Sequence, residues 1–264
     1  MSFARDELLP PAASEPGASQ PGASQPGAGD TAGLVFVAEM YGVPLDQLAA
    51  ALDVSPRRAG DLAARWVARR LARAGRLAPG PRWVWLTRAG LTACGLPYPP
   101  SPPALPRLAH LRAVIAVRLA LEAVPAYQDG AAHWRSERRL RARLGGRLGQ
   151  RDHLPDAEVH WPDEAGAALG WAGECWAIEA ELTPKTVTRT TAIMAELLTR
   201  TGDYGCPAAE ARVPGRPPRH ARVIYLCSPA AAGTVSRARD ALGGDGARVE
   251  IRGLPGSGYL PAPG

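Results

Sequence analysis

Apolar residues recur at helical spacing in three segments near the start of the chain, residues 31–42, 44–54 and 56–75. In the second segment, the apolar positions fall on one helix face. In the third, Ser55 is a suitable N-cap, Pro56 suits the first helical position, and Gly75 is placed just beyond the end. The pattern therefore predicts three consecutive helices.

Residues 76–90 change from helical spacing to the alternation of two short strands around a Pro-Gly turn. Three helices followed by such a hairpin predict a winged helix-turn-helix over residues 31–97. Before it, residues 1–30 contain a Pro-Gly-Ala-Ser-Gln repeat without apolar positions to bury, which predicts a disordered tail. After it, residues 98–106 are rich in proline and are predicted to be a linker.

The remainder of the chain, residues 107–256, alternates helical and strand-like segments before a short tail, 257–264. Helical patterns are expected at 107–124, within 133–145, from Pro184 to about Thr201, and at 232–242. Apolar strand-like runs occupy 156–161, 174–182, 221–228 and 247–254. This order predicts an α/β fold with a mixed central sheet.

The charge distribution suggests an anionic partner for the first domain. The chain carries a formal charge of +6. The segment between Arg57 and Arg82 is rich in arginine and contains a single acidic residue, Asp61. Such a run favours contacts with the phosphates of double-stranded DNA. The candidate DNA-binding residues are Arg57, Arg58, Arg65, Arg69, Arg70 and Arg82. A solvated arginine face remains an alternative, as does a helix for protein contacts or homodimerisation.

Other features of the composition limit the class of protein. The four cysteines form no CxxC pair, which is typical of reduced thiols and argues against a zinc ribbon; the histidines likewise show no ligand spacing. An apolar run long enough for a membrane helix is missing, and the first residues lack the pattern of a signal peptide. We therefore expect a cytoplasmic protein without a membrane partner.

The acidic residues of the second domain are expected to meet on a β-hairpin. If Asp156 lies opposite Glu179, the centre of the hairpin falls at Ala167 and Ala168, inside a Gly/Ala-rich loop. Alternation along the strand then directs Glu179 and Glu181 to one face. A cluster of this kind normally holds a divalent cation. The alternative is a hairpin with solvent-facing carboxylates.

Lys185 follows this strand and is the only lysine in the chain. We expect Thr183 to cap the next helix, with Pro184 at its first position and Lys185 at its second. A lysine there opposes the helix dipole, so a negative group nearby, either Glu181 or a phosphate, better explains it. Asp163 is expected to be an ordinary loop residue.

The Leu-Pro-Asp at 154–156, followed by Ile-Glu-Ala-Glu-Leu-Thr-Pro-Lys at 178–185, resembles the PD-(D/E)XK motif of the restriction-endonuclease-like fold. Together with the preceding winged helix, this order resembles the replication-relaxation family of bacterial plasmids and mobile elements, over about residues 31–230. One departure is Glu181, which stands where that motif usually has lysine.

The resemblance implies a DNA-binding protein with a nuclease-like domain, acting in the replication or transfer of such elements. It also implies a catalytic set of Asp156, Glu179, Glu181, Lys185 and Glu137, with Asp156, Glu179 and Glu137 as ligands of Mg²⁺ or Mn²⁺. An active metal-dependent endonuclease and an inactive DNA-binding module both remain open, and so does a protein-binding adaptor.

Overall fold

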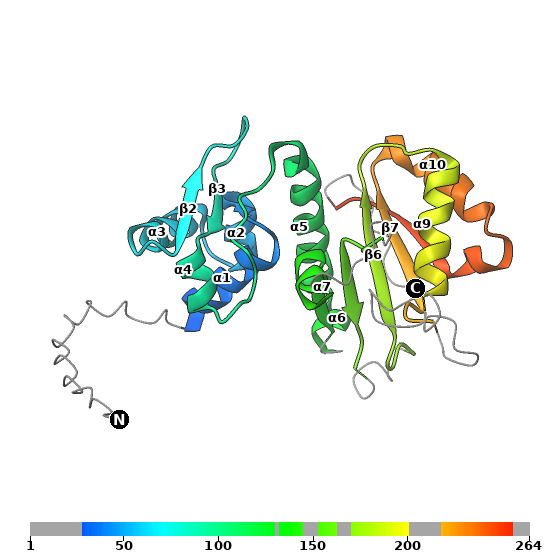
Figure 1. The fold of residues 1–264 in the computed structure, drawn as a ribbon, viewed down its shortest axis with the longest axis horizontal. Coiled ribbons are helices and arrows are strands. Elements are labelled where there is room, and N and C mark those ends of the chain that lie inside the picture. The colour runs from blue at the N-terminus through cyan, green and yellow to red at the C-terminus, as the bar shows by residue number, and fades with distance from the viewer. Residues whose placement is uncertain (1–27, 130–131, 145–152, 163–169, 201–217, 256–264) are drawn as a thin grey trace, which may run out of the picture.

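The computed structural model describes residues 28–129, 132–144, 153–162, 170–200 and 218–255. Both predicted tails lie almost entirely outside these residues, as do Asp163 and the centre of the predicted hairpin loop. The described chain is a mixed α/β structure with two sheets (Figure 1). Among the described residues, no helix is both long and apolar enough to cross a membrane.

The first part of the chain folds as helices around a small antiparallel sheet of order β1-β3-β2. Its elements are α1 (Ala28–Glu39), β1 (Val43–Pro44), α2 (Leu45–Ala51), α3 (Pro56–Ala68), β2 (Ala72–Gly75), β3 (Trp83–Leu86) and α4 (Arg88–Ala93). The three expected helices are therefore present, and so is an antiparallel strand pair, but its first strand precedes the predicted hairpin and lies at the end of the segment expected to be the third helix. Ser55 caps α3 as predicted, since its side chain accepts a hydrogen bond from Arg58 N at 3.2 Å.

The third helix is shorter than predicted, because α3 ends at Ala68 rather than near Gly75. Arg70 adopts a left-handed backbone conformation with φ 57°. Its N–H donates to Val67 O at 2.9 Å, and Leu71 N–H donates to Trp66 O at 2.9 Å. These are the two hydrogen bonds of a Schellman motif, which terminates a helix. Arg69 and Arg70 therefore follow the helix instead of lying on its face.

The second part forms a five-stranded mixed sheet of order β4-β5-β6-β7-β8, which confirms the predicted sheet type. β4, β5 and β6 are antiparallel, and β6, β7 and β8 are parallel. Its elements are α5 (Leu108–Glu122), α6 (Pro125–Asp129), β4 (His133–Ser136), α7 (Glu137–Leu144), β5 (Ala157–His160), β6 (Cys175–Glu181), α9 (Val187–Thr199), β7 (Arg222–Cys227), α10 (Pro229–Asp240), η4 (Gly243–Arg248) and β8 (Val249–Gly253).

Helices cover both faces of this sheet, with α5 on the side of the first part and α9 and α10 on the other (Figure 1). The two faces of β6 explain the arrangement. Ile178 and Ala180 join the core beneath α5, whereas Ala177 joins the core beneath α9 and α10. Every residue of β6 is buried, Glu179 and Glu181 included. These two carboxylates share the face of Ala177 because side chains alternate along a strand.

The proline-rich segment is packed against the rest of the molecule rather than extended between two bodies. Tyr98 is buried, and Leu105–Arg107 forms a 3₁₀ turn, η1, that leads into α5. One apolar cluster contains residues from α1 and α3 as well as residues from α5, β5, β6 and β7. The segment therefore joins two parts that share a core.

Candidate functional site

The predicted hairpin register is confirmed by the pairing of β5 and β6. Ala157 pairs with Ile178, so Asp156 enters β5 opposite Glu179. Asp156 also binds this strand directly, because its Oδ2 accepts a hydrogen bond from Ala180 N at 2.8 Å. The sheet thus brings the Asp156 carboxylate to the part of β6 that carries Glu179 and Glu181.

A histidine from α5 contacts the first of these carboxylates. His110 Nε2 lies 2.7 Å from Asp156 Oδ1. Burial lowers the pKa of His110, but the hydrogen bond and the charge of Asp156 outweigh burial and leave the pKa above its usual value. The two oxygens of Asp156 therefore have an imidazole and a backbone N–H as partners.

A second histidine contacts Glu179. His153 Nε2 lies 2.7 Å from Glu179 Oε1, and the His153 N–H donates to Glu196 Oε1 on α9 at 2.9 Å. Burial raises the pKa of Glu179 to about 7, against the lowering effect of His153, and the nearby Asp156 charge adds to the rise. The pKa of His153 is also raised, because Glu179 outweighs burial there. Glu179 and His153 therefore bind protons more tightly in the folded protein than the same side chains do when exposed to water.

Lys185 pairs with Glu181, which is one of the two negative partners expected for this lysine. Its place in the chain differs from the prediction. α9 begins at Val187, and its N-cap is Thr186, whose side chain accepts from Arg189 N at 3.2 Å. Neither Thr183 nor Pro184 belongs to the helix, and Lys185 precedes the cap. Its amino group also lowers the pKa of Glu179, so its charge reaches both carboxylates.

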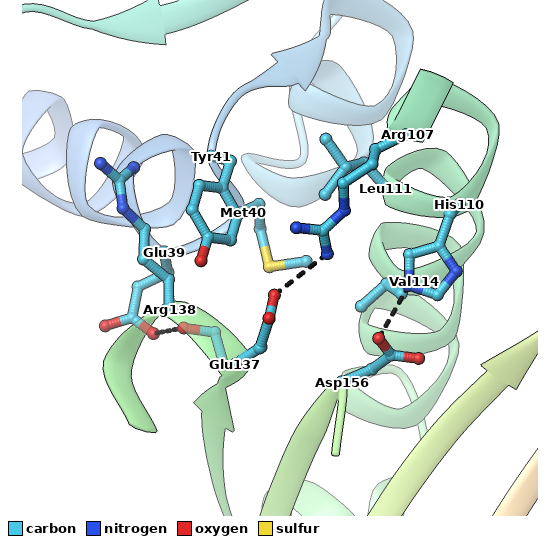
Figure 2. Close-up of a pocket in the computed structure, with 11 residues that line it drawn as sticks. Glu39, Met40, Tyr41, Arg107, His110, Leu111, Val114, Glu137, Arg138 and Asp156 are labelled. Carbon is cyan, nitrogen blue, oxygen red and sulfur yellow. Dashed lines mark hydrogen bonds and ion pairs between the residues drawn. The ribbon is translucent and has the colours of Figure 1, made fainter. Parts of the chain in front are cut away.

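Glu137 lies at the start of α7, on the far side of Asp156 from Glu179. Its carboxylate binds Arg107 at 3.1 Å and Arg141 at 2.5 Å, and its backbone N–H donates to Asp156 O at 2.9 Å. Glu137 and Asp156 line a common cavity of about 20 Å³, together with Arg107 and His110 (Figure 2). A cavity of this size has room for about one water molecule. Glu137 therefore shares a pocket with Asp156, while two arginines hold its carboxylate.

The predicted DNA-binding arginines are mostly exposed. Arg57, Arg58 and Arg65 lie on α3, whose opposite face buries Ala59, Leu62, Ala63 and Trp66. Arg70 and Arg82 are also exposed, near the small sheet. Asp30 of α1 lies 3.4 Å from Arg65 and 3.9 Å from Arg69. One acid from outside the arginine-rich segment thus faces two of the six arginines.

Sequence reasoning missed His110 and His153, which contact two of the predicted metal ligands. Their spacing shows no ligand pattern because one lies on a helix and the other just before β5. Two local signals were nevertheless present. His110 is one of the few polar positions in a mostly apolar helix, and His153 stands beside the Leu-Pro-Asp that carries Asp156.

No family model matches the chain, and no curated protein is similar to it. Among solved structures, the chain is similar in part to the crystal structure of RV1404 from Mycobacterium tuberculosis, with a TM-score of 0.24 and 20% identity. The alignment covers 39% of this chain and 65% of that chain, which is less than two thirds of RV1404. A similarity at this level assigns neither a fold family nor a function to the chain.

Proposed function

We propose that the chain is a DNA-binding protein in which a winged helix precedes a nuclease-like α/β domain. The order α1-β1-α2-α3-β2-β3, with the sheet β1-β3-β2, supports a winged helix. In this arrangement α3 is the helix that enters the major groove. The resemblance of the motifs to the replication-relaxation family supports a role in replicating or transferring plasmids or mobile elements, in the bacterial cytoplasm.

One observation carries the proposal: Arg57 and Arg58 stand exposed in the first turn of α3. Positive charges at a helix N-terminus oppose the helix dipole and cost about 0.3–1 kcal/mol each. Within the part of the chain that the structure describes, no carboxylate forms an ion pair with either residue. A DNA phosphate would supply the missing negative charge, and helix N-termini bind phosphates well.

The salt dependence of DNA binding tests this assignment. Each phosphate contact contributes about 0.9 to the slope of log affinity against log salt. We expect Arg57→Ala/Arg58→Ala to weaken binding to a DNA duplex and to reduce that slope by about 1.8. Fluorescence anisotropy at several salt concentrations measures both quantities.

A matched control removes the same net charge elsewhere. Arg237 and Arg239 lie in the last turn of α10, in the second part of the chain. Arg237→Ala/Arg239→Ala should leave the slope close to that of the wild type. Equal slopes in the wild type and both variants would show that α3 does not contact the DNA phosphates. Weak binding that does not respond to salt would instead favour a protein-binding adaptor.

A second candidate function is Mg²⁺- or Mn²⁺-dependent DNA cleavage, favoured by the meeting of Asp156 and Glu179 on the hairpin. Carboxylate oxygens are the ligands that these cations prefer. Burial and the Asp156 charge raise the pKa of Glu179, and a divalent cation would offset that repulsion. Asp156 and Glu179 therefore fit such a cation. When bound, it would activate water and screen the charge developing on the phosphate.

DNA binding without cleavage remains the first proposal because every carboxylate of the set already has a partner. His110 and Ala180 N occupy Asp156, His153 faces Glu179, and Lys185 faces Glu181. Glu137 binds Arg107 and Arg141. These contacts compete with a metal ion.

Incubating the protein with supercoiled plasmid in Mg²⁺, Mn²⁺ or EDTA separates the two candidates. A nuclease should nick or cut only with a metal ion, and Asp156→Asn or Glu179→Gln should abolish cutting while DNA binding persists. Lys185→Arg keeps the charge beside Glu181 but changes the shape of the side chain. It should therefore reduce cutting without loss of DNA binding. Glu250→Gln, on β8, is the control. Intact plasmid under all conditions would contradict cleavage and leave DNA binding as the only one of the two functions.

A further inference from the structure

A second cluster of ionisable side chains lies on the same sheet, away from the carboxylate site. It contains Glu158 and His160 of β5, Cys175 at the start of β6, and Arg219 and His220 just before β7. His160 pairs directly with Cys175, and Ala221 N–H donates to Cys175 O at 2.9 Å. At about 3.3 Å per residue, His160 lies roughly 13 Å along the strand from Asp156. The cluster therefore forms a separate site.

The ligand atoms of Glu158, Cys175 and His220 lie close to one another, and His160 contacts two of these three residues. Glu158 is completely buried; its Oε1 lies 2.9 Å from His220 Nε2, and its Oε2 lies 2.9 Å from His160 Nε2. Cys175 Sγ lies 3.4 Å from the same His160 nitrogen. One ligand atom each from Glu158, Cys175 and His220 falls within 4.8 Å of the others.

This geometry differs from that of a cysteine nucleophile with a histidine base. In such a relay, the thiol and the orienting carboxylate face different nitrogens of the imidazole. Here Cys175 and Glu158 both face His160 Nε2. A thiol and a carboxylate that both contact one imidazole nitrogen instead lie as three ligands of one metal ion would lie.

His220 is oriented as a metal-binding histidine is. Its Nδ1 lies 3.0 Å from Leu197 O on α9, which directs Nε2 towards Glu158. A backbone carbonyl at one ring nitrogen commonly fixes the other nitrogen of a metal ligand. Both nitrogens of His220 thus face oxygen acceptors, and a cation at Nε2 would satisfy that side of the ring.

Arg219 leaves room on Glu158 for a further partner. Its Nε and Nη2 donate to the two carboxylate oxygens at 2.6 and 2.8 Å. An ionised carboxylate has about four lone-pair sites, so this fork leaves about one on each oxygen, on the sides that His220 and His160 face.

We propose that Glu158, His160, Cys175 and His220 bind one Zn²⁺ ion as a structural site. Thiolate, imidazole and carboxylate donors are a typical zinc set, and four protein ligands leave no open position for catalysis. The ion would join β5, β6 and the start of β7, with Arg219 as an outer partner of Glu158. His160 is partly exposed and offers the route by which the metal enters.

Cobalt binding to the full-length protein tests the site, because Co²⁺ replaces Zn²⁺ in tetrahedral sites and reports thiolate ligands by a charge-transfer absorption. We expect one equivalent of Co²⁺ to give intense visible bands and that charge-transfer band, and Zn²⁺ to abolish both. Cys175→Ser should lose the charge-transfer band. Cys227→Ser, at a buried cysteine of β7 outside the cluster, should retain it. Asp156→Asn should also retain it, since the carboxylate site is separate.

A second variant keeps the test decisive if Cys175→Ser does not fold. Replacing Cys94, Cys206 and Cys227 by Ser leaves Cys175 as the only thiol, and this protein should still give the one-to-one charge-transfer band. Absence of the band from the wild type would overturn the proposal and show that Arg219 and the histidines alone neutralise Glu158. A band that persists in Cys175→Ser would overturn it as well.

Discussion

At the scale of single residues, two glutamates on the same face of the sheet differ in how their burial is offset. Glu158 is completely buried, and burial alone would raise its pKa. Hydrogen bonds from His160, His220 and Arg219 outweigh that effect and hold its pKa far below the usual value. Among the described residues, Glu179 has only His153 as a hydrogen-bonding partner, so burial dominates and its pKa rises to about 7. The number of hydrogen-bonding partners decides the ionisation of each carboxylate.

This difference predicts how pH affects stability through Glu179. An unfolded glutamate has a pKa of about 4.3, so between that value and about 7 the folded protein binds a proton that the unfolded chain has lost. Stability from Glu179 is therefore present at low pH and is lost as the pH rises towards 7. The raised pKa of His153 acts in the same direction. Each such proton changes the free energy of unfolding by at most about 1.4 kcal/mol per pH unit.

The variant Glu179→Gln isolates this effect, because glutamine does not ionise. Relative to the wild type, we expect the variant to become more stable by about 2 kcal/mol as the pH rises from 5 to 7.5. Urea unfolding in EDTA, followed by circular dichroism, measures the difference. Glu250→Gln, at a half-buried position of β8, is the control for the loss of a carboxylate away from His153. A pH-independent difference for Glu179→Gln would contradict the assignment.

At the scale of elements, the end of α3 depends on one residue in an unfavourable conformation. Arg70 closes the Schellman motif with φ 57°, a region that costs an L-residue about 1–2 kcal/mol and costs glycine little. Arg70→Gly should therefore raise the free energy of unfolding by about 1 kcal/mol after the greater flexibility of unfolded glycine is counted. Arg69→Gly, at φ −81°, should lower it. Chemical denaturation of both variants checks the opposite signs.

The helix ends also show which features of this fold were predictable from sequence. The strands β5 to β8 and the β5-β6 register were predictable because alternation and hairpin length are local and mutually consistent. By contrast, β4 and β2 lie in segments whose spacing had predicted helices. Helix ends were less so, because several residues compete for the same role. Thr186 rather than Thr183 caps α9, and Arg70 rather than Gly75 ends α3.

The candidate site was predictable only in its acidic half. Asp156 and Glu179 belong to one hairpin, so their meeting follows from local pairing. His110 reaches Asp156 from α5, and His220 reaches Glu158 from beyond β6. Such contacts depend on how helices pack on the sheet, and a single sequence carries no direct signal of that packing.

At the scale of the whole molecule, a buried polar network joins the first part of the chain, the proline-rich segment and the second part. Glu39 of α1 accepts hydrogen bonds from Tyr98 OH at 2.9 Å and from Ser136 Oγ at 2.7 Å. Arg138 of α7 donates to Ala38 O at 2.7 Å and to Pro99 O at 2.6 Å. Its guanidinium also stacks on the rings of Tyr41 and Tyr98. Together with the shared apolar core, this network couples the two parts.

The coupling predicts that the protein unfolds in one transition, although its sequence divides into two predicted domains. Differential scanning calorimetry should give a single peak whose calorimetric and van't Hoff enthalpies agree. Arg138→Met should remove the link, because it leaves the buried carbonyls of Ala38 and Pro99 without their donor. A buried acceptor left without a donor costs about 1–3 kcal/mol, so the melting temperature should fall and the peak should broaden or split. Arg139→Met, at the exposed neighbouring position, removes the same charge and should leave a single peak near the wild-type temperature. Two peaks in the wild type would show instead that the two parts fold independently and that the buried network does not couple them.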